Sequence, residues 1–208
     1  FLTDDSDVAA FDALVAAWRH PEPRSVAPEP RPARGVERAD RDIDLAAFHA
    51  GWRALNDVHQ FHGFLRDFGV SRQQGFRLAP PGQAWRVALN ATEHMLRSAA
   101  SRQLPIMAFV GNAGMIQIHT GPVQRIETVG AWLNVLDSGF NLHLREDLID
   151  AAWVTHKPGD SGVVTSLELF DRDGQSVVTF FGARKPGQPE QPAWQALMDS
   201  LPKEAGHG

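Results

Sequence analysis

Residues 163–181 decide the fold and read Val163-Val164-Thr165-Ser166-Leu167-Glu168-Leu169-Phe170-Asp171-Arg172-Asp173-Gly174-Gln175-Ser176-Val177-Val178-Thr179-Phe180-Phe181. Two runs rich in β-branched and aromatic residues flank Asp173-Gly174, a dipeptide that favours the positive φ angles of a tight turn. The segment therefore predicts two antiparallel strands, Val163–Phe170 and Ser176–Phe181, joined by a hairpin.

The chain before this hairpin repeats the same alternation of apolar runs and turn residues. Glycine-containing pairs such as Gly111-Asn112, Gly121-Pro122 and Ser138-Gly139 separate the runs. Short loops between successive strands predict a large antiparallel β-sheet meander. The predicted strands are Trp85–Leu89, Ile106–Val110, Met115–Thr120, Val123–Thr128, Ala131–Leu136, Asn141–Leu144 and Trp153–His156.

Apolar residues at helical spacing predict several helices around these strands. In the region from Leu45 to Phe68 the apolar stripe changes face near Asn56-Asp57, where a break is expected. Asp42 or Asp44 can cap the first part, Asp57 the second, and Gly69 ends the second in the left-handed region. Further helices are predicted over residues 7–20, 91–102 and 191–201.

The N-terminal 43 residues differ in composition from the rest. Residues 21–43 are rich in proline and charge and predict an extended linker. The helix Phe11–Trp18 matches Trp194–Leu201 in residue type along its length, which predicts that residues 1–20 are the terminal helix of a preceding repeat. Two unrelated amphipathic helices are the alternative. Residues 44–208 form the main domain in this prediction.

Composition excludes several classes of function. The 208 residues carry a formal net charge of −5, which argues against a surface for nucleic acid or anionic membranes. The chain has no cysteine, so disulfides, thiolate metal sites and cysteine nucleophiles are excluded. No apolar run approaches the ~20 residues that span a bilayer, and no signal-like segment opens the chain, so we expect a cytoplasmic protein without membrane insertion.

The segment Trp52–His62 holds the most informative polar residues. On a helix that starts at Asp57, His59, His62 and Arg66 share one flank beside the apolar stripe. Each histidine could be an ordinary boundary residue. The alternative is a neutral imidazole that ligates a metal or a haem iron from a rigid element. No carboxylate pair or third ligand is evident nearby, which favours haem over a bare metal ion.

Three cations stand at the ends of predicted elements, Arg72, Lys157 and Arg184. Strand-end cations are usually solvated, but together these three could pair two propionate groups, because guanidinium and ammonium groups both bind carboxylates. His119 and His143 are expected on an open sheet face. Gly111–Gly114 predicts a hairpin turn and no phosphate loop, and no catalytic residues are identified.

The sequence resembles the HemS/HmuS/ChuS/PhuS haem-utilisation family from about residue 44 to 202. The resemblance implies an α+β fold that the family duplicates in tandem, with this chain as the second copy and a remnant of the first. It rests on Asp57–His62, Phe68–Arg72, Gly111–Gly114, Ile116–Val123, Trp132–Asp137, Phe140–Arg145, Trp153-Val154, Lys157-Pro158, Val164–Glu168 and Phe180–Lys185.

The resemblance also implies a binding site. It makes His59 the proximal ligand of haem iron, with His62 where some relatives carry an alternative histidine. Arg72, Lys157 and Arg184 fall on the cations that contact the propionates. Thr179 and Phe181 replace the Gln and Tyr that relatives often carry on the sheet wall, so an aromatic wall is kept and a phenol is lost. The absent first copy supplies a distal arginine in relatives.

The implied function is that of a bacterial, cytoplasmic haem-binding protein for haem uptake, trafficking and iron utilisation. Its expected partners are haem and an importer or a haem oxygenase. One alternative is a haem-degrading, oxygenase-like enzyme, and another is a structural or dimerisation half without haem. A copy that normally packs on its twin should expose an apolar surface, so we expect a homodimer or packing on a preceding repeat.

Overall fold

The computed structural model of the chain describes residues 4, 6–22, 35–112, 114–185 and 187–204. The chain divides into two compact units, Phe1–Ala33 and Arg34–Gly208. The described element of the first unit is helix α1 (Val8–Trp18), which buries none of its residues and begins where the Asp7 side chain accepts a hydrogen bond from the Ala10 amide. Most of the predicted linker, residues 23–34, lies outside the described residues.

The second unit contains five α-helices and nine strands among its described residues. The helices are α2 (Leu45–Ala54), α3 (Gln60–Phe68), α4 (Arg72–Arg77), α5 (Ala91–Ser101) and α6 (Pro192–Asp199). The strands are β1 (Ala84–Val87), β2 (Ile106–Gly111), β3 (Ile116–Gly121), β4 (Ile126–Val129), β5 (Trp132–Asp137), β6 (Phe140–Arg145), β7 (Ile149–Gly159), β8 (Gly162–Asp171) and β9 (Ser176–Gly182).

The strands form two antiparallel sheets, which confirms the predicted α+β fold on a large antiparallel sheet. The larger sheet has the order β1-β7-β8-β9-β2-β3, and the smaller has the order β4-β5-β6. Strands β7, β8 and β9 follow one another as predicted, with Gly174 at a φ of 75° in the β8–β9 turn. The pairing of β9 with β2 joins distant parts of the chain. Strands β4–β6 were predicted as part of the same meander but form a separate three-stranded sheet.

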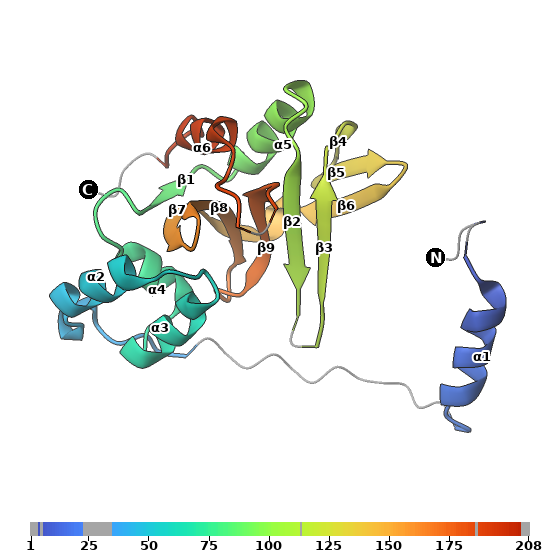
Figure 1. Cartoon of the computed structure of the whole chain (residues 1–208), viewed down its shortest axis with the longest axis horizontal. Coiled ribbons are helices and arrows are strands. Elements are labelled where there is room, and N and C mark those ends of the chain that lie inside the picture. Colours follow the sequence, from blue (N-terminus) through green and yellow to red (C-terminus); the bar gives the residue numbers. More distant parts are fainter. Residues whose placement is uncertain (1–3, 5, 23–34, 113, 186, 205–208) are drawn as a thin grey trace. The chain divides into compact units, whose positions relative to one another are not determined.

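Helices cover the two faces of the large sheet unequally. One hydrophobic core joins α5 and α6 to one face and to the small sheet, and a second joins α2, α3 and α4 to β7 and β8. Figure 1 shows α2–α4 grouped together and α5 with α6 on the other side of the sheet. The face under α2–α4 is therefore covered at its β7–β8 part, while β9, β2 and β3 extend beyond these helices.

Two of the three predicted helix ends are confirmed, the start of α2 at Asp44 and the end of α3 at Gly69. The Asp44 side chain accepts a hydrogen bond from the Ala47 amide at 2.9 Å and begins α2. The prediction that Asp57 caps α3 is wrong: the helix begins at Gln60, with His59 at the N-cap and no capping side chain, and Asp57 accepts from the His59 amide at 2.8 Å before it. Gly69, with a φ of 64°, ends the helix. The short helix α4 was not predicted; Ser71 caps it by accepting from the Gln74 amide.

The last part of the predicted linker belongs to the second unit and is held against α4. Arg77 on α4 donates to Asp40 Oδ2 at 2.7 Å and to Glu37 Oε2 at 3.0 Å. The fully buried Gln74 donates to Asp40 Oδ1 at 2.8 Å. The Arg77 hydrogen bond lowers the pKa of Asp40 from 3.8 to about 2. These contacts fix residues 37–42 beside α4.

Gly182, at the end of β9, permits close packing against α6. A Cβ at this position would lie 2.6 Å from Cγ of Trp194, whose side chain is fully buried. We expect Gly182→Ala to lower the free energy of unfolding by about 1–3 kcal/mol, the usual cost of overpacking. Urea denaturation followed by tryptophan fluorescence measures this. Gly139→Ala, where nothing lies within 4 Å of the added Cβ, is the matched control.

Candidate functional site

A cavity of about 390 Å³ lies between the start of α3 and the uncovered part of the large sheet, within the size range of ligand pockets. Six of the seven predicted site residues line it; His62 does not. The lining residues are Val58, His59, Arg72, Met107, Phe109, Ile116, Lys157, Val164, Thr179, Phe181 and Arg184. A neighbouring cavity of about 290 Å³ shares His59 and Arg184 with it and extends the site along Asp160.

Two adjacent strands build the sheet wall of the cavity. Phe181 and Thr179 on β9 pair with Met107 and Phe109 on β2, respectively. Since alternate residues of a strand point to the same face, all four side chains lie on one surface. The Phe109 and Phe181 rings meet edge to face, with centroids 5.2 Å apart. The wall is therefore apolar, with Thr179 as its polar group.

His59 stands at the mouth of the cavity, immediately before α3. Its side chain is 90% exposed, and its Nδ1–H donates to Asp57 Oδ1 at 2.7 Å. In the neutral ring this bond places the proton on Nδ1 and leaves Nε2 as the acceptor, and Nε2 has no hydrogen-bond partner among the described residues. The hydrogen bonds from the backbone and ring of His59 lower the pKa of Asp57. A carboxylate that orients an imidazole in this way is typical of histidines that bind metals.

His62 is exposed and lies one turn further along α3, outside the cavity lining. Only one of the two histidines that the sequence placed on one flank therefore lines the cavity. His59 is the one brought together with the predicted cations and the apolar wall.

A buried carboxylate, Glu168 on β8, lies beneath the cavity and holds two of the predicted cations. Arg72 donates from Nε to Oε2 at 2.6 Å and from Nη2 to Oε1 at 3.1 Å, while Lys157 Nζ donates to Oε1 at 2.7 Å. Glu168 is fully buried, and the Lys157 side chain is only 4% exposed. The two cations thus belong to one buried network and are not the freely solvated strand-end groups that the sequence left open.

Burial and charge act together on this network. Complete burial lowers the pKa of Lys157 from 10.5 to about 8, although the Glu168 carboxylate opposes the shift. Burial alone would raise the pKa of Glu168, but the charges of Arg72 and Lys157 lower it from 4.5 to about 2. At neutral pH all three groups are therefore predominantly charged.

Arg184 also lines the cavity, but it is not hydrogen-bonded to Glu168 and forms no ion pair with the described residues. Its Nη1 donates to Ser161 Oγ at 3.3 Å, and its side chain is half-buried. An arginine with unused donors in a cavity is well suited to bind a carboxylate.

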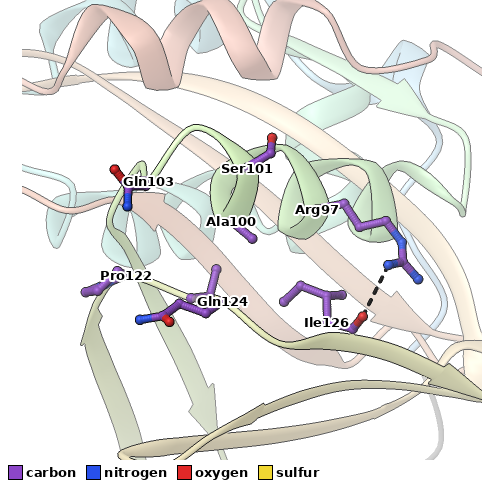
Figure 2. A pocket seen from close by; sticks show the side chains of 8 residues that line it. Arg97, Ala100, Ser101, Gln103, Pro122, Gln124 and Ile126 are labelled. Atoms are coloured by element: carbon purple, nitrogen blue, oxygen red, sulfur yellow. Dashed lines mark hydrogen bonds between the residues drawn. The ribbon is translucent and has the colours of Figure 1, made fainter.

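A larger cavity of about 760 Å³ lies between α5 and residues 122–126 and contains none of the predicted site residues. Figure 2 shows the Arg97 side chain reaching from α5 towards the Ile126 carbonyl, to which it donates at 3.2 Å. Arg97 also pairs with Glu93 at 2.7 Å, and no aromatic side chain lines the cavity. We therefore assign the candidate site to the smaller cavity, where cations, imidazole and aromatic rings meet.

The other two histidines considered in the sequence, His119 and His143, lie outside the candidate site. His119 is not on an open face: its ring stacks on Phe140 of the small sheet, with centroids 3.7 Å apart, and so joins the two sheets. His143 Nδ1–H donates to Asn134 Oδ1 at 2.8 Å. Within the described ranges, no group of three His, Asp or Glu residues is arranged to hold a metal ion. No helix of the described part is long and apolar enough to cross a bilayer.

Sequence reasoning missed Glu168, Phe109 and Met107 as parts of the site. Glu168 carried a usable signal, because it interrupts the apolar run Leu167–Phe170 in a strand predicted to be buried. A carboxylate in such a strand is rarely buried without a cationic partner.

Comparison with known proteins gives this site a context. The model of a family described as the haemin-degrading HemS.ChuX domain matches residues 69–201. The hemin transport protein HmuS of Yersinia pestis is 38% identical over 201 residues, which are 97% of this chain and 58% of that protein. This chain thus spans less than two thirds of the length of that relative.

Solved structures agree with the sequence comparison. Holo-PhuS, a haem-binding protein from Pseudomonas aeruginosa, has a TM-score of 0.90 and 45% identity, covering 98% of this chain and 59% of that one. ChuS, an E. coli haem oxygenase, has a TM-score of 0.79 and 38% identity, covering 96% and 58%, respectively. The structure of ChuX, at 11% identity and a TM-score of 0.62, shares the fold alone.

Proposed function

The chain belongs to the haemin-degrading HemS/ChuX family, and from this we propose that it binds haem in the cavity between His59 and the uncovered part of the large sheet. The observation that carries the proposal is the convergence of an oriented imidazole, an apolar aromatic wall and arginine side chains in one cavity. A haem needs these three environments for its iron, its macrocycle and its propionates, respectively.

Each residue has a distinct role in this proposal. His59 ligates the iron through Nε2, and Asp57 holds the ring in the required tautomer through Nδ1. Phe181 and Thr179 contact the macrocycle. Arg72, Lys157 and Arg184 provide the positive charge for the propionates. Bound haem supplies a redox-active iron, whose reactivity depends on its ligand and on the polarity around it.

We propose that the physiological role is haem carriage in the cytoplasm, with transfer to or from an importer or a haem oxygenase. Relatives at 38% identity are named hemin transport proteins, which supports this role. The haem-degrading alternative is supported by ChuS, which is described as a haem oxygenase. Loss of the Soret band on adding reductant and oxygen, with release of a tetrapyrrole product, would favour degradation over carriage.

A haemin titration followed by visible absorption tests the binding proposal. We expect a saturable shift of the Soret band with one haemin per chain. We expect no haemin to bind in the larger cavity beside α5, because that cavity is lined by neither a histidine nor an aromatic side chain. A wild-type chain that leaves the haemin spectrum unchanged would contradict the proposal and favour the structural or dimerisation half.

We further propose that residues 44–208 are the haem-binding domain, that residues 1–20 end a preceding repeat, and that the chain taken alone forms a homodimer. Met115, Ile116 and Ile118 are 66%, 58% and 54% exposed on the β2–β3 hairpin, at an edge of the large sheet. An exposed apolar edge favours association with a second copy or with a preceding repeat. We expect light scattering at high concentration to give a dimer, and Ile118→Lys to give a monomer. A wild-type monomer would contradict the dimer.

A further inference from the structure

We infer that Glu168 is a positioning residue for the anionic side of the bound ligand, because its buried carboxylate orients Arg72 and retains Lys157 beneath the cavity. This inference rests on the proposed haem binding and deepens it. From the sequence, Arg72, Lys157 and Arg184 were expected to be equivalent contacts for carboxylates. The hydrogen bonds of Glu168 make them differ in the number of N–H donors that remain free for a ligand.

Lys157 has no donor left for a ligand. Its Nζ donates to Thr155 Oγ1 at 2.5 Å, to Ser166 Oγ at 3.2 Å and to Glu168 Oε1 at 2.7 Å. An ammonium group has three N–H donors, so these three acceptors account for all of them. Lys157 therefore contributes charge from beneath the cavity, and a direct bond to a propionate would require it to give up one of these partners.

Of the two cations that Glu168 holds, Arg72 is the one that keeps free donors. Its Nε and Nη2 each donate one hydrogen bond to Glu168, while Nη1 has no hydrogen-bond partner among the described residues. Its side chain is 32% exposed, in contrast to that of Lys157. The bidentate contact with Glu168 fixes the plane of the guanidinium, so the remaining donors are presented in one orientation.

The same network braces the start of α3, directly after the predicted iron ligand. Arg72 Cζ lies 5.3 Å from the centroid of the Phe61 ring, and Lys157 Nζ lies 5.0 Å from it. Phe61 is two residues after His59, at the start of α3. Glu168 thus keeps both cations against the element that positions His59, through cation–π contacts.

Charge balance also favours a ligand with two carboxylates. Arg72, Lys157 and Glu168 together carry one net positive charge, and Arg184 adds a second. A dicarboxylate such as haem presents two negative charges. Without Glu168 the cations would repel each other in a buried environment, and the pKa of Lys157 would fall further because the attraction of the carboxylate is lost.

The experiment compares two ligands that differ only in their carboxylates, haemin and haemin dimethyl ester. For Glu168→Gln we expect about tenfold weaker binding of haemin, the size of one charge-assisted hydrogen bond, and a change of at most about twofold for the ester. A purely structural ion pair would weaken both ligands equally. Glu190→Gln is the matched control. Glu190 is also buried but accepts hydrogen bonds from Thr165 and Gln195 away from the cavity.

A double-substitution cycle tests whether Glu168 acts through Arg72. We expect Arg72→Lys to reduce haemin affinity by a similar factor, and the double variant to bind no more weakly than Arg72→Lys alone. If Glu168→Gln does not fold, Glu168→Asp keeps the charge but withdraws the carboxylate by one methylene, and it should show the same selective loss for haemin.

The outcomes separate this inference from the function on which it rests. A wild-type chain that does not bind haemin overturns both. Wild-type binding, combined with equal losses for haemin and its ester or with no loss in Glu168→Gln and Glu168→Asp, overturns the positioning role alone.

Discussion

Replacement of His59 by alanine is expected to weaken haemin binding by at least about a hundredfold and to alter the Soret maximum, because it removes the proposed iron ligand. The neighbouring residues support folding without His59. Its side chain is 90% exposed, and Asp57 still accepts the backbone amide of residue 59. The loss should therefore appear in the haemin titration and not in the far-ultraviolet circular dichroism spectrum.

His62→Ala is the matched control for this prediction. His62 is an exposed histidine on α3, three residues after His59, but it does not line the cavity. We expect this variant to bind haemin as the wild type does. An unchanged Soret shift in His59→Ala, together with its loss in His62→Ala, would move the ligand to His62. No loss in either variant would refute axial ligation by either histidine.

The elements that local sequence specifies were predicted well, and those that depend on distant contacts were not. The β8–β9 hairpin and the end of α3 follow from Gly174 and Gly69, whose positive φ angles the sequence could anticipate. Helix α4 (Arg72–Arg77) lacks an apolar period and contains Gly75. It is held by Phe76 in the second core and by the hydrogen bonds of Gln74. The division into two sheets depends on β9 pairing with β2, which no local pattern encodes.

The candidate site divides in the same way. His59 could be found because its motif is local, and the cations because the resemblance has matching spacing along the chain. The state of those cations could not be predicted. Arg72 and Glu168 are 96 positions apart, and only the fold brings both, with Lys157, into one buried network. The resemblance in spacing along the chain identified the cations, but only the fold determines which of their N–H donors remain free.

The same network predicts a loss of stability in acid. The pKa of Glu168 is about 2 in the folded chain, compared with 4.5 as its ordinary value, because Arg72 and Lys157 favour its charged form. Its contribution to stability is therefore present above pH 4.5 and is lost as the pH falls towards 2. A fully buried carboxylate with this shift corresponds to roughly 3 kcal/mol of unfolding free energy.

Urea denaturation at a series of pH values between 7 and 2 measures this contribution, with the fluorescence of the six tryptophans as the signal. We expect the wild type to lose stability steeply below pH 4.5 and Glu168→Gln to show a shallower fall, because a glutamine does not titrate. Lys157 acts at the other end of the scale: its pKa of about 8 in the folded chain means that this group adds stability as the pH rises from 8 to 10.5. If the stability of the wild type and of Glu168→Gln falls in parallel as the pH is lowered, the Glu168 carboxylate is not stabilised by Arg72 and Lys157. The orientation of Arg72 would then need another cause.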